Sequence, residues 1–193
     1  MASGHAPSAW PAPDRHWTLF LDRDGVINER LPDDYVKEPS AFRFLPGVTQ
    51  ALSRLSQIFG RIIVVTNQQG IGKGLMDEDM LRSVHQVMLE GIVMAGGRVD
   101  AVIYCPHRAD EGCPCRKPAI GMFERARELF PDIRAERSIM VGDSPSDMLF
   151  ALNCGMGAVG VGANPGLFAH SRMMVADLHE FTDILSPPIP DPL

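Results

Sequence analysis

The stretch "WTLFLDRDG" (residues 17–25) decides the fold, because an apolar run that is typical of a strand ends abruptly in aspartate and glycine. The pattern returns in "RIIVVTNQQG" (61–70), which reaches Thr66, and in "RSIMVGD" (137–143), which ends in Asp143. Continuous apolar runs of this kind indicate strands that are buried on both faces of a parallel sheet. Ligands bind outside the carboxyl ends of such strands, so we expect these polar residues to gather at one edge.

Helical patterns alternate with these strands, which predicts an α/β fold with a Rossmann-like parallel sheet and helices on both faces. Helices are expected at 47–59, 77–96, 120–130 and 145–155. Two further strands are expected at 99–105 and 157–162. The chain has 193 residues, enough for one domain with a full core. We expect a flexible tail at 1–16, a single domain at 17–186 and a second tail at 187–193.

Composition narrows the class of protein. The net charge of −6 argues against a broad nucleic-acid-binding surface. No apolar run approaches the length of a membrane span, and the N-terminal residues lack a stretch of signal-peptide type. We therefore expect a cytoplasmic monomer that binds a small molecule and contacts neither membrane nor nucleic acid.

The two aspartates of "DRDG" carry the sharpest chemical signal. Asp22 and Asp24 are suited to share a divalent cation such as Mg²⁺, or to divide nucleophilic and acid–base roles. Asp143 adds a carboxylate ligand, Thr66 a hydroxyl donor to a phosphoryl group, and Lys117 a positive charge. Each of these aspartates, and Thr66, could instead merely cap the turn or helix that follows it, an alternative that explains them singly better than together.

Three of the four cysteines fall in "YCPHRADEGCPCRKP" (104–118). With one histidine they form a complete tetrahedral set for Zn²⁺: Cys105, His107, Cys113 and Cys115. Four protein ligands leave no open position, so the site is predicted to be structural. The alternatives are buried thiols beside a surface histidine, or a disulfide, which a cytosolic location disfavours. Cys154 stands apart in a predicted helix and is expected in the core.

A basic pair, Arg116 and Lys117, directly follows the last of these cysteines. A metal that holds the loop would also determine where both side chains begin. We expect Lys117 to contact a phosphoryl group and Arg116 a second anionic group of the substrate. The alternative is a solvated basic surface.

Four segments together resemble, in order, the motifs of haloacid dehalogenase-like phosphatases: "FLDRDGVIN" (20–28), "VVTNQQG" (64–70), "CRKP" (115–118) and "VGDSPSDM" (141–148). The resemblance covers about residues 17–165. It implies that Asp22 attacks phosphorus to form an aspartyl-phosphate and that Asp24 switches from acid to base. It also implies Mg²⁺ ligands at the Asp22 carboxylate, the Asp24 backbone carbonyl and Asp143. The substrate phosphate would contact Thr66, Asn67, Gln68, Gln69, Arg116 and Lys117.

The cysteine-rich segment resembles two branches of that family, the D-glycero-D-manno-heptose-1,7-bisphosphate 7-phosphatases and the histidinol-phosphate phosphatases. Both lack a large cap domain, and residues 29–42 leave room here for only a short flap. The first branch is favoured by "DRDGVIN" and "TNQQGIGKG". Hydrolysis of the heptose 7-phosphate is therefore the leading expectation and histidinol phosphate the alternative. Ser144 departs from the first branch, in which many members have lysine.

Two other classes of function are less well supported. A nucleic-acid 3′-phosphatase would need a basic track for the polynucleotide backbone, which this acidic chain lacks. A non-catalytic interaction module held by zinc would not need the aspartate pair at 22 and 24.

Overall fold

The computed structural model describes residues 12–163, 165–167 and 169–185. Its centre is β1 (Thr18–Leu21), a strand whose four residues are all buried. Six parallel strands form one sheet in the order β3-β2-β1-β4-β5-β6. The other five strands are β2 (Arg61–Asn67), β3 (Ala101–Cys105), β4 (Ser138–Gly142), β5 (Gly157–Val161) and β6 (Met173–Val175).

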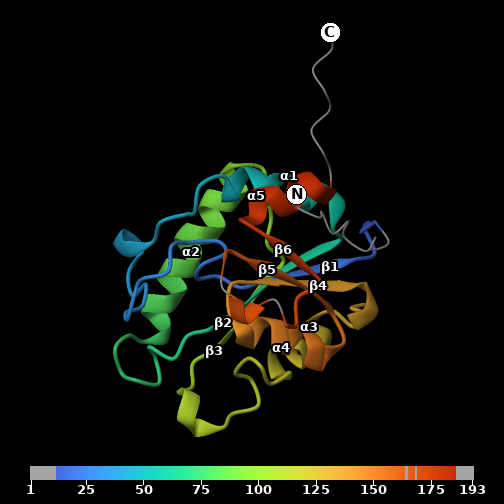
Figure 1. Ribbon diagram of the computed structural model, residues 1–193. Helices are drawn as coiled ribbons and strands as arrows, with labels where there is room; N and C mark the ends of the chain where they lie inside the picture. The colour runs from blue at the N-terminus through green and yellow to red at the C-terminus, as the bar shows by residue number, and fades with distance from the viewer. Residues whose placement is uncertain (1–11, 164, 168, 186–193) are drawn as a thin grey trace.

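Helices cover both faces of the sheet (Figure 1). One face packs against α1 (Val48–Ile58), α2 (Glu78–Met94) and α5 (Leu178–Leu185), and the other against α3 (Gly121–Leu129) and α4 (Pro145–Cys154). Along β1, Leu19 and Leu21 point into the first core and Phe20 into the second, because successive strand side chains face opposite ways. The Rossmann-like prediction is confirmed.

The predicted elements occur, and their ends differ from the predicted ones by at most two residues. Two further elements, β6 and α5, were not predicted from the sequence. A three-residue strand carries too little pattern to stand out, but α5 had a usable signal: Asp177 accepts a hydrogen bond from the backbone N–H of Glu180, a helix N-terminal cap. The predicted tails lie mostly outside the described residues; within them, the Trp17 N–H bonds to the Asp14 carbonyl in a turn that leads into β1.

Strand register brings the predicted site residues to one edge. Leu21 is level with Val64 of β2 and with Val141 of β4. Asp22 continues this ladder, with its N–H bonded to the Val141 carbonyl at 3.0 Å. The chain between β1 and α1 contains only a short 3₁₀ turn, Pro39–Ala41, so this edge is not covered by a cap domain. None of the described helices is long and apolar enough to cross a membrane.

Candidate active site

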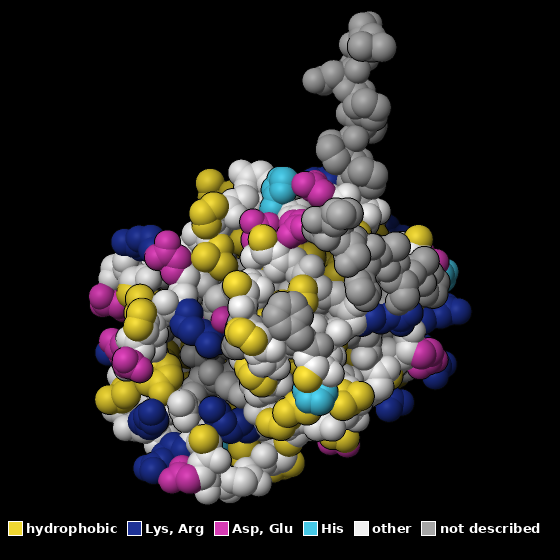
Figure 2. Space-filling model, viewed as in Figure 1, with side chains coloured by type: hydrophobic (Ala, Val, Ile, Leu, Met, Phe, Trp, Pro, Cys, Tyr) yellow, Lys and Arg dark blue, Asp and Glu magenta, His cyan; other side chains and the backbone are white. Residues whose placement is uncertain are grey.

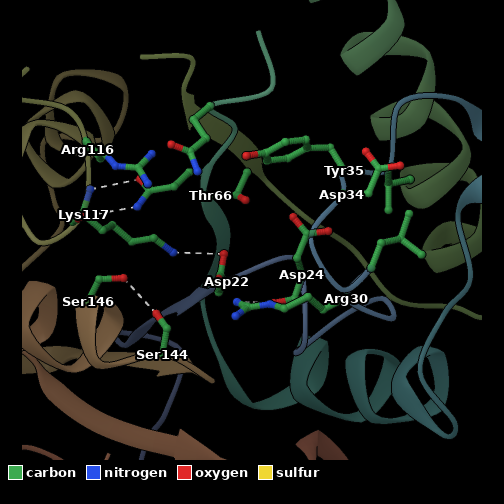
Figure 3. Close-up of a pocket in the computed structure, with 14 residues that line it drawn as sticks. Asp22, Asp24, Arg30, Asp34, Tyr35, Thr66, Arg116, Lys117, Ser144 and Ser146 are labelled. Carbon is green, nitrogen blue, oxygen red and sulfur yellow. Dashed lines mark hydrogen bonds and ion pairs between the residues drawn. The ribbon is translucent and has the colours of Figure 1, made fainter. Parts of the chain in front are cut away.

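Asp22 lies at the centre of the candidate site, directly after β1 (Figure 3). It is 6% exposed, and its Oδ1 accepts hydrogen bonds from the Arg23 N–H at 2.7 Å and from Lys117 Nζ at 3.0 Å. Burial raises the pKa of Asp22 to about 6; the charge of Lys117 opposes the rise, while Asp147 and Asp24 add to it. The carboxylate is therefore ionised near neutral pH but strongly dependent on nearby positive charge.

Lys117 is held from several directions. Its Nζ lies 2.6 Å from Asp147 Oδ1 and donates to the Val65 carbonyl at 2.8 Å. The Asn67 side chain binds both the backbone N–H and the backbone carbonyl of Lys117, at 3.0 and 3.2 Å. Burial lowers the pKa of Lys117, but the carboxylates of Asp147 and Asp22 outweigh burial and raise it, so the ammonium group stays charged.

Asp24 is oriented by three side chains. Arg23 Nη2 lies 2.9 Å from both of its carboxylate oxygens, Asn28 donates to Oδ1 at 2.9 Å and Gln68 to Oδ2 at 2.8 Å. Burial raises the pKa of Asp24, but the charge of Arg23 and these hydrogen bonds hold it below its usual range. Arg23 is fully buried, and its Nη1 lies 3.2 Å from Nε2 of His85 on α2. A buried cation thus fixes the direction in which Asp24 points.

Three carboxylates converge beside this pair. Oxygens of Asp22, Asp143 and Asp147 lie within 4.8 Å of one another. Burial, with the charge of Asp22, raises the pKa of Asp143 to about 7 against the lowering effect of Arg30. Gly25, at φ +88°, makes this approach possible, because a side chain there would begin 1.9 Å from Asp143 Oδ2.

These groups fit a magnesium ion. Carboxylate and carbonyl oxygens are the ligands that Mg²⁺ prefers, and clustered carboxylates need a cation to offset their repulsion. In the structure, Arg30 supplies positive charge there: its Nη2 lies 2.8 Å from Asp143 Oδ1 and 3.3 Å from the Asp24 carbonyl. Two of the three predicted magnesium ligands are therefore gathered around one cation, at the base of the site.

A cavity of about 290 Å³ lies above these residues. Figure 3 shows Lys117 and Arg116 entering it from one side and the flap residues Asp34 and Tyr35 from the other, with Asp22, Asp24 and Thr66 between them. Of the predicted substrate contacts, Thr66, Asn67, Gln69, Arg116 and Lys117 line the cavity. The buried Gln68 side chain instead donates to Asp24 and Thr66.

The cysteine cluster lies directly after β3, next to the Arg116–Lys117 pair. One ligand atom from each of Cys105, His107, Cys113 and Cys115 falls within a single 4.8 Å group. The sulfur atoms are 3.1–3.5 Å apart and His107 Nδ1 lies 3.3 Å from the Cys115 sulfur. These separations approach the edge, about 3.8 Å, of a tetrahedron with zinc–sulfur bonds of about 2.3 Å. All four cysteines of the chain are free thiols, so the donor set fits zinc.

Several residues of the site were not singled out from the sequence. Asp147, four positions after Asp143, was expected at this edge but was given no role. Its Oδ2 accepts a hydrogen bond from the Ser144 N–H at 3.0 Å at the start of α4, and its Oδ1 lies 2.6 Å from Lys117 Nζ. The Arg23–His85 contact and the place of Arg30 had no signal, because they depend on how α2 and the flap pack around β1.

Known proteins share both the sequence and this architecture. A family model described as HAD-hydrolase-like matches residues 114–171. A D-glycero-alpha-D-manno-heptose-1,7-bisphosphate 7-phosphatase of Mycobacterium bovis is 42% identical over 137 residues, which is 71% of this chain and 72% of that protein. The beta-heptose enzyme of Bordetella bronchiseptica is 39% identical over 71% of this chain and 75% of that protein.

Solved structures agree with the sequence comparisons. The crystal structure of D,D-heptose 1,7-bisphosphate phosphatase from B. bronchiseptica, complexed with magnesium and phosphate, superposes with a TM-score of 0.80 at 34% identity, over 88% of this chain and 97% of that one. The corresponding Burkholderia thailandensis structure has a TM-score of 0.65 at 30% identity, over 88% and 99% of the two chains. The chain belongs to the haloacid dehalogenase-like phosphatases, in the family of the heptose-1,7-bisphosphate 7-phosphatases.

Proposed function

We propose that this protein is a magnesium-dependent phosphatase that removes the 7-phosphate of D-glycero-D-manno-heptose 1,7-bisphosphate, with a structural zinc ion beside the site. One observation carries the chemistry: the buried Asp22 carboxylate, the charged Lys117 and the oriented Asp24 line one cavity. The sugar comes from the relatives, whose names specify this substrate.

The first step forms a bond between the Asp22 carboxylate and phosphorus and breaks the bond to the sugar oxygen, while Asp24 protonates that oxygen. When bound, Mg²⁺ supplies positive charge that offsets the repulsion between Asp22 and the phosphate. Lys117 and the Thr66 hydroxyl stabilise negative charge on the phosphoryl oxygens.

The second step returns Asp22 to its starting form. Asp24 removes a proton from water, which attacks the aspartyl-phosphate and releases inorganic phosphate. The lowered pKa of Asp24 suits this role, because the carboxylate is the base. The first step needs the protonated form, and the approach of a phosphate dianion shifts Asp24 towards it, because a neighbouring negative charge raises the pKa of a carboxylate.

Arg116 is the proposed contact for the second phosphate of the substrate. It lines the cavity and donates to the His107 carbonyl at 3.4 Å, so the zinc loop (residues 105–115) supports it. Arginine binds phosphate through two parallel hydrogen bonds, which favours a bisphosphate over a substrate with a single phosphate.

Phosphate release from three substrates tests the proposal: the alpha and beta anomers of heptose 1,7-bisphosphate, and histidinol phosphate. One heptose anomer should exceed histidinol phosphate in kcat/KM by at least about 100-fold, roughly the contribution of one fully used charge-assisted contact. An equal or higher kcat/KM for histidinol phosphate would overturn the assignment. The Asp22→Asn protein, purified in parallel, controls for contaminating phosphatases.

A further inference from the structure

A second polar pocket lies at the opposite end of the sheet from Asp22. It has a volume of about 200 Å³. Its walls come from the chain leading into β1 and β2 and from the turn before β4: Arg15, His16, Trp17, Thr18, Gly60, Arg61, Asp132, Arg134 and Arg137. Figure 2 shows Lys and Arg side chains gathered along the right-hand edge, where the chain enters β1 in Figure 1. Nothing in the proposed reaction uses this pocket.

The charge in the pocket is strongly unbalanced. Four guanidinium groups and one imidazole face a single carboxylate, Asp132, although the whole chain has a net charge of −6. Like charges brought together in a partly enclosed pocket repel one another, and a bound anion relieves that repulsion.

Two of the four guanidinium groups are held in place. Arg61 Nη2 lies 2.8 Å from both oxygens of Asp132, and its guanidinium lies 4.3 Å from the centre of the Phe130 ring. Arg15 donates to the Ser56 carbonyl at 3.2 Å. A ligand would therefore meet two cations that are already ordered, which lowers the entropic cost of binding.

The other two guanidinium groups, those of Arg134 and Arg137, are free to contact a ligand. Arg134 precedes the short turn before β4 and Arg137 ends it, and both are exposed. Within the described part of the chain neither guanidinium has a hydrogen-bond or ion-pair partner, although the charge of Arg134 helps Arg61 to lower the pKa of Asp132. Glu136, between them in sequence, lines a different pocket.

The backbone of the pocket depends on a close approach at Gly60. A side chain at this position would begin 1.9 Å from the Arg15 carbonyl oxygen. Glycine therefore lets the segment before β1 lie directly against the start of β2, which brings Arg15 and Arg61 into the same wall.

We propose that this pocket binds a small phosphate anion carrying at least two negative charges, at a site separate from the catalytic one. The planar, multiply donating guanidinium group matches phosphate oxygens, and two unpartnered arginines offer paired contacts. The pocket lies at the amino ends of strands whose carboxyl ends carry the catalytic residues. The four residues of β1 alone separate the two sites by roughly 13 Å, at about 3.3 Å per residue.

Trp17 provides a local reporter, because it lines the pocket, and Trp10→Phe removes the only other tryptophan. The zinc- and magnesium-loaded Trp10→Phe protein is titrated with inorganic phosphate at pH 8, against potassium chloride of equal ionic strength. Pyrophosphate, in buffer without magnesium, tests whether linked phosphoryl groups bind more tightly. We expect a saturable change in Trp17 fluorescence with phosphate and none with chloride.

The variant Arg134→Gln/Arg137→Gln should weaken phosphate binding at least tenfold. Its matched control, Arg125→Gln/Arg127→Gln on the exposed face of α3, removes the same charge elsewhere and should leave the affinity within twofold of that of the parent. The proposal is overturned by an unsaturable response, by a loss of less than tenfold in the pocket variant, or by a comparable loss in the control. Circular dichroism melting establishes that both variants fold.

Discussion

The catalytic edge and the zinc loop are built in opposite ways. The catalytic edge, defined by Asp22, Asp24, Lys117, Asp143 and Asp147, assembles residues more than a hundred positions apart through the register of parallel strands. The zinc loop draws all four ligands from eleven consecutive residues. The first site is therefore a property of the whole sheet, whereas the second is a local cluster that could hold a metal ion.

Packing supports this contrast. Lys117 and Asp147 are buried and joined by a short ion pair. Removing one partner of a buried ion pair strongly destabilises the folded state, because the other charge is left unpaired. The zinc loop carries an exposed 3₁₀ turn, Ala109–Glu111, and a surface ion pair between Arg108 and Asp110, which contributes little stability. The loop is tied to the rest of the protein mainly at its two ends, where the Pro106 carbonyl accepts from the Gly72 N–H and the Pro114 carbonyl from the Gly121 N–H, both at 2.9 Å.

The largest expected effect concerns the catalytic edge alone. Asp22→Asn should lower kcat by at least about 10⁴-fold, as loss of a catalytic nucleophile does. The protein should still fold, because the substitution removes a buried negative charge and so reduces the repulsion among Asp22, Asp24 and Asp147. Phosphate release measures the first effect and thermal melting the second.

Elemental analysis supplies the control for that experiment. Asp22→Asn should retain about one zinc per chain, because no zinc ligand changes. Loss of zinc together with activity would show that the two regions are not independently built. Residual turnover near the wild-type rate would exclude Asp22 as the nucleophile.

Opening the zinc loop should have the next largest effect. Cys113→Ser removes one ligand and should release the metal, lower the melting temperature and reduce kcat/KM by about 100-fold or more, because Arg116 and Lys117 both follow the last ligand. Zinc content, melting and phosphate release are measured on the same sample.

Cys154→Ser is the matched control. Cys154 lies at the end of α4, outside the cluster, so this change should leave zinc content intact. If Cys113→Ser lost zinc yet kept full activity, the loop would not position the basic pair. An equal zinc loss in both variants would point to general instability.

The contrast between the two regions also explains what the sequence could predict. Buried apolar runs marked β1, β2 and β4, and the residues at their ends pointed to the edge of the sheet where the structure places the cavity. The cluster of three cysteines and one histidine was visible from spacing alone. The buried Arg23 was not predictable, because a charged residue between two aspartates gives no sign that it turns into the core towards His85. Arg30 was missed for a similar reason, since its contact with Asp143 spans 113 positions through an irregular flap.

A smaller and more selective effect is expected at the junction of the two regions. For heptose bisphosphate, Arg116→Ala should cost about 2–3 kcal/mol in kcat/KM, the range for a charge-assisted hydrogen bond. For p-nitrophenyl phosphate, which has no second anion, the cost should be small. Lys117→Ala should instead reduce kcat for both substrates, because its buried ammonium contacts Asp22. If Arg116→Ala lowered kcat/KM equally for both substrates, Arg116 would not bind a second phosphate, and the assignment of a bisphosphate substrate would lose this support.

The smallest effect should appear in the free energy of unfolding. It concerns the buried contact between Arg23, which binds Asp24, and His85 on α2. Burial and the charge of Arg23 lower the pKa of His85 to about 3, with Asp24 opposing them. Below about pH 6.5, His85 therefore binds a proton in the unfolded chain but not in the folded chain. Its contribution to the free energy of unfolding is present above about pH 6.5 and declines as the pH falls towards 3. Between pH 7 and 5.5 the decline should be about 1–2 kcal/mol.

His85→Gln tests this link, because glutamine can still accept a hydrogen bond from Arg23 but does not titrate. Urea unfolding at pH 7 and 5.5 should show a smaller loss of stability in the variant than in the wild type. Acid also releases zinc by protonating its ligands, but that loss occurs in both proteins and cancels in the difference. The control His170→Gln removes an exposed imidazole outside the network. If it flattened the pH dependence equally, the effect would not arise from the buried contact between His85 and Arg23.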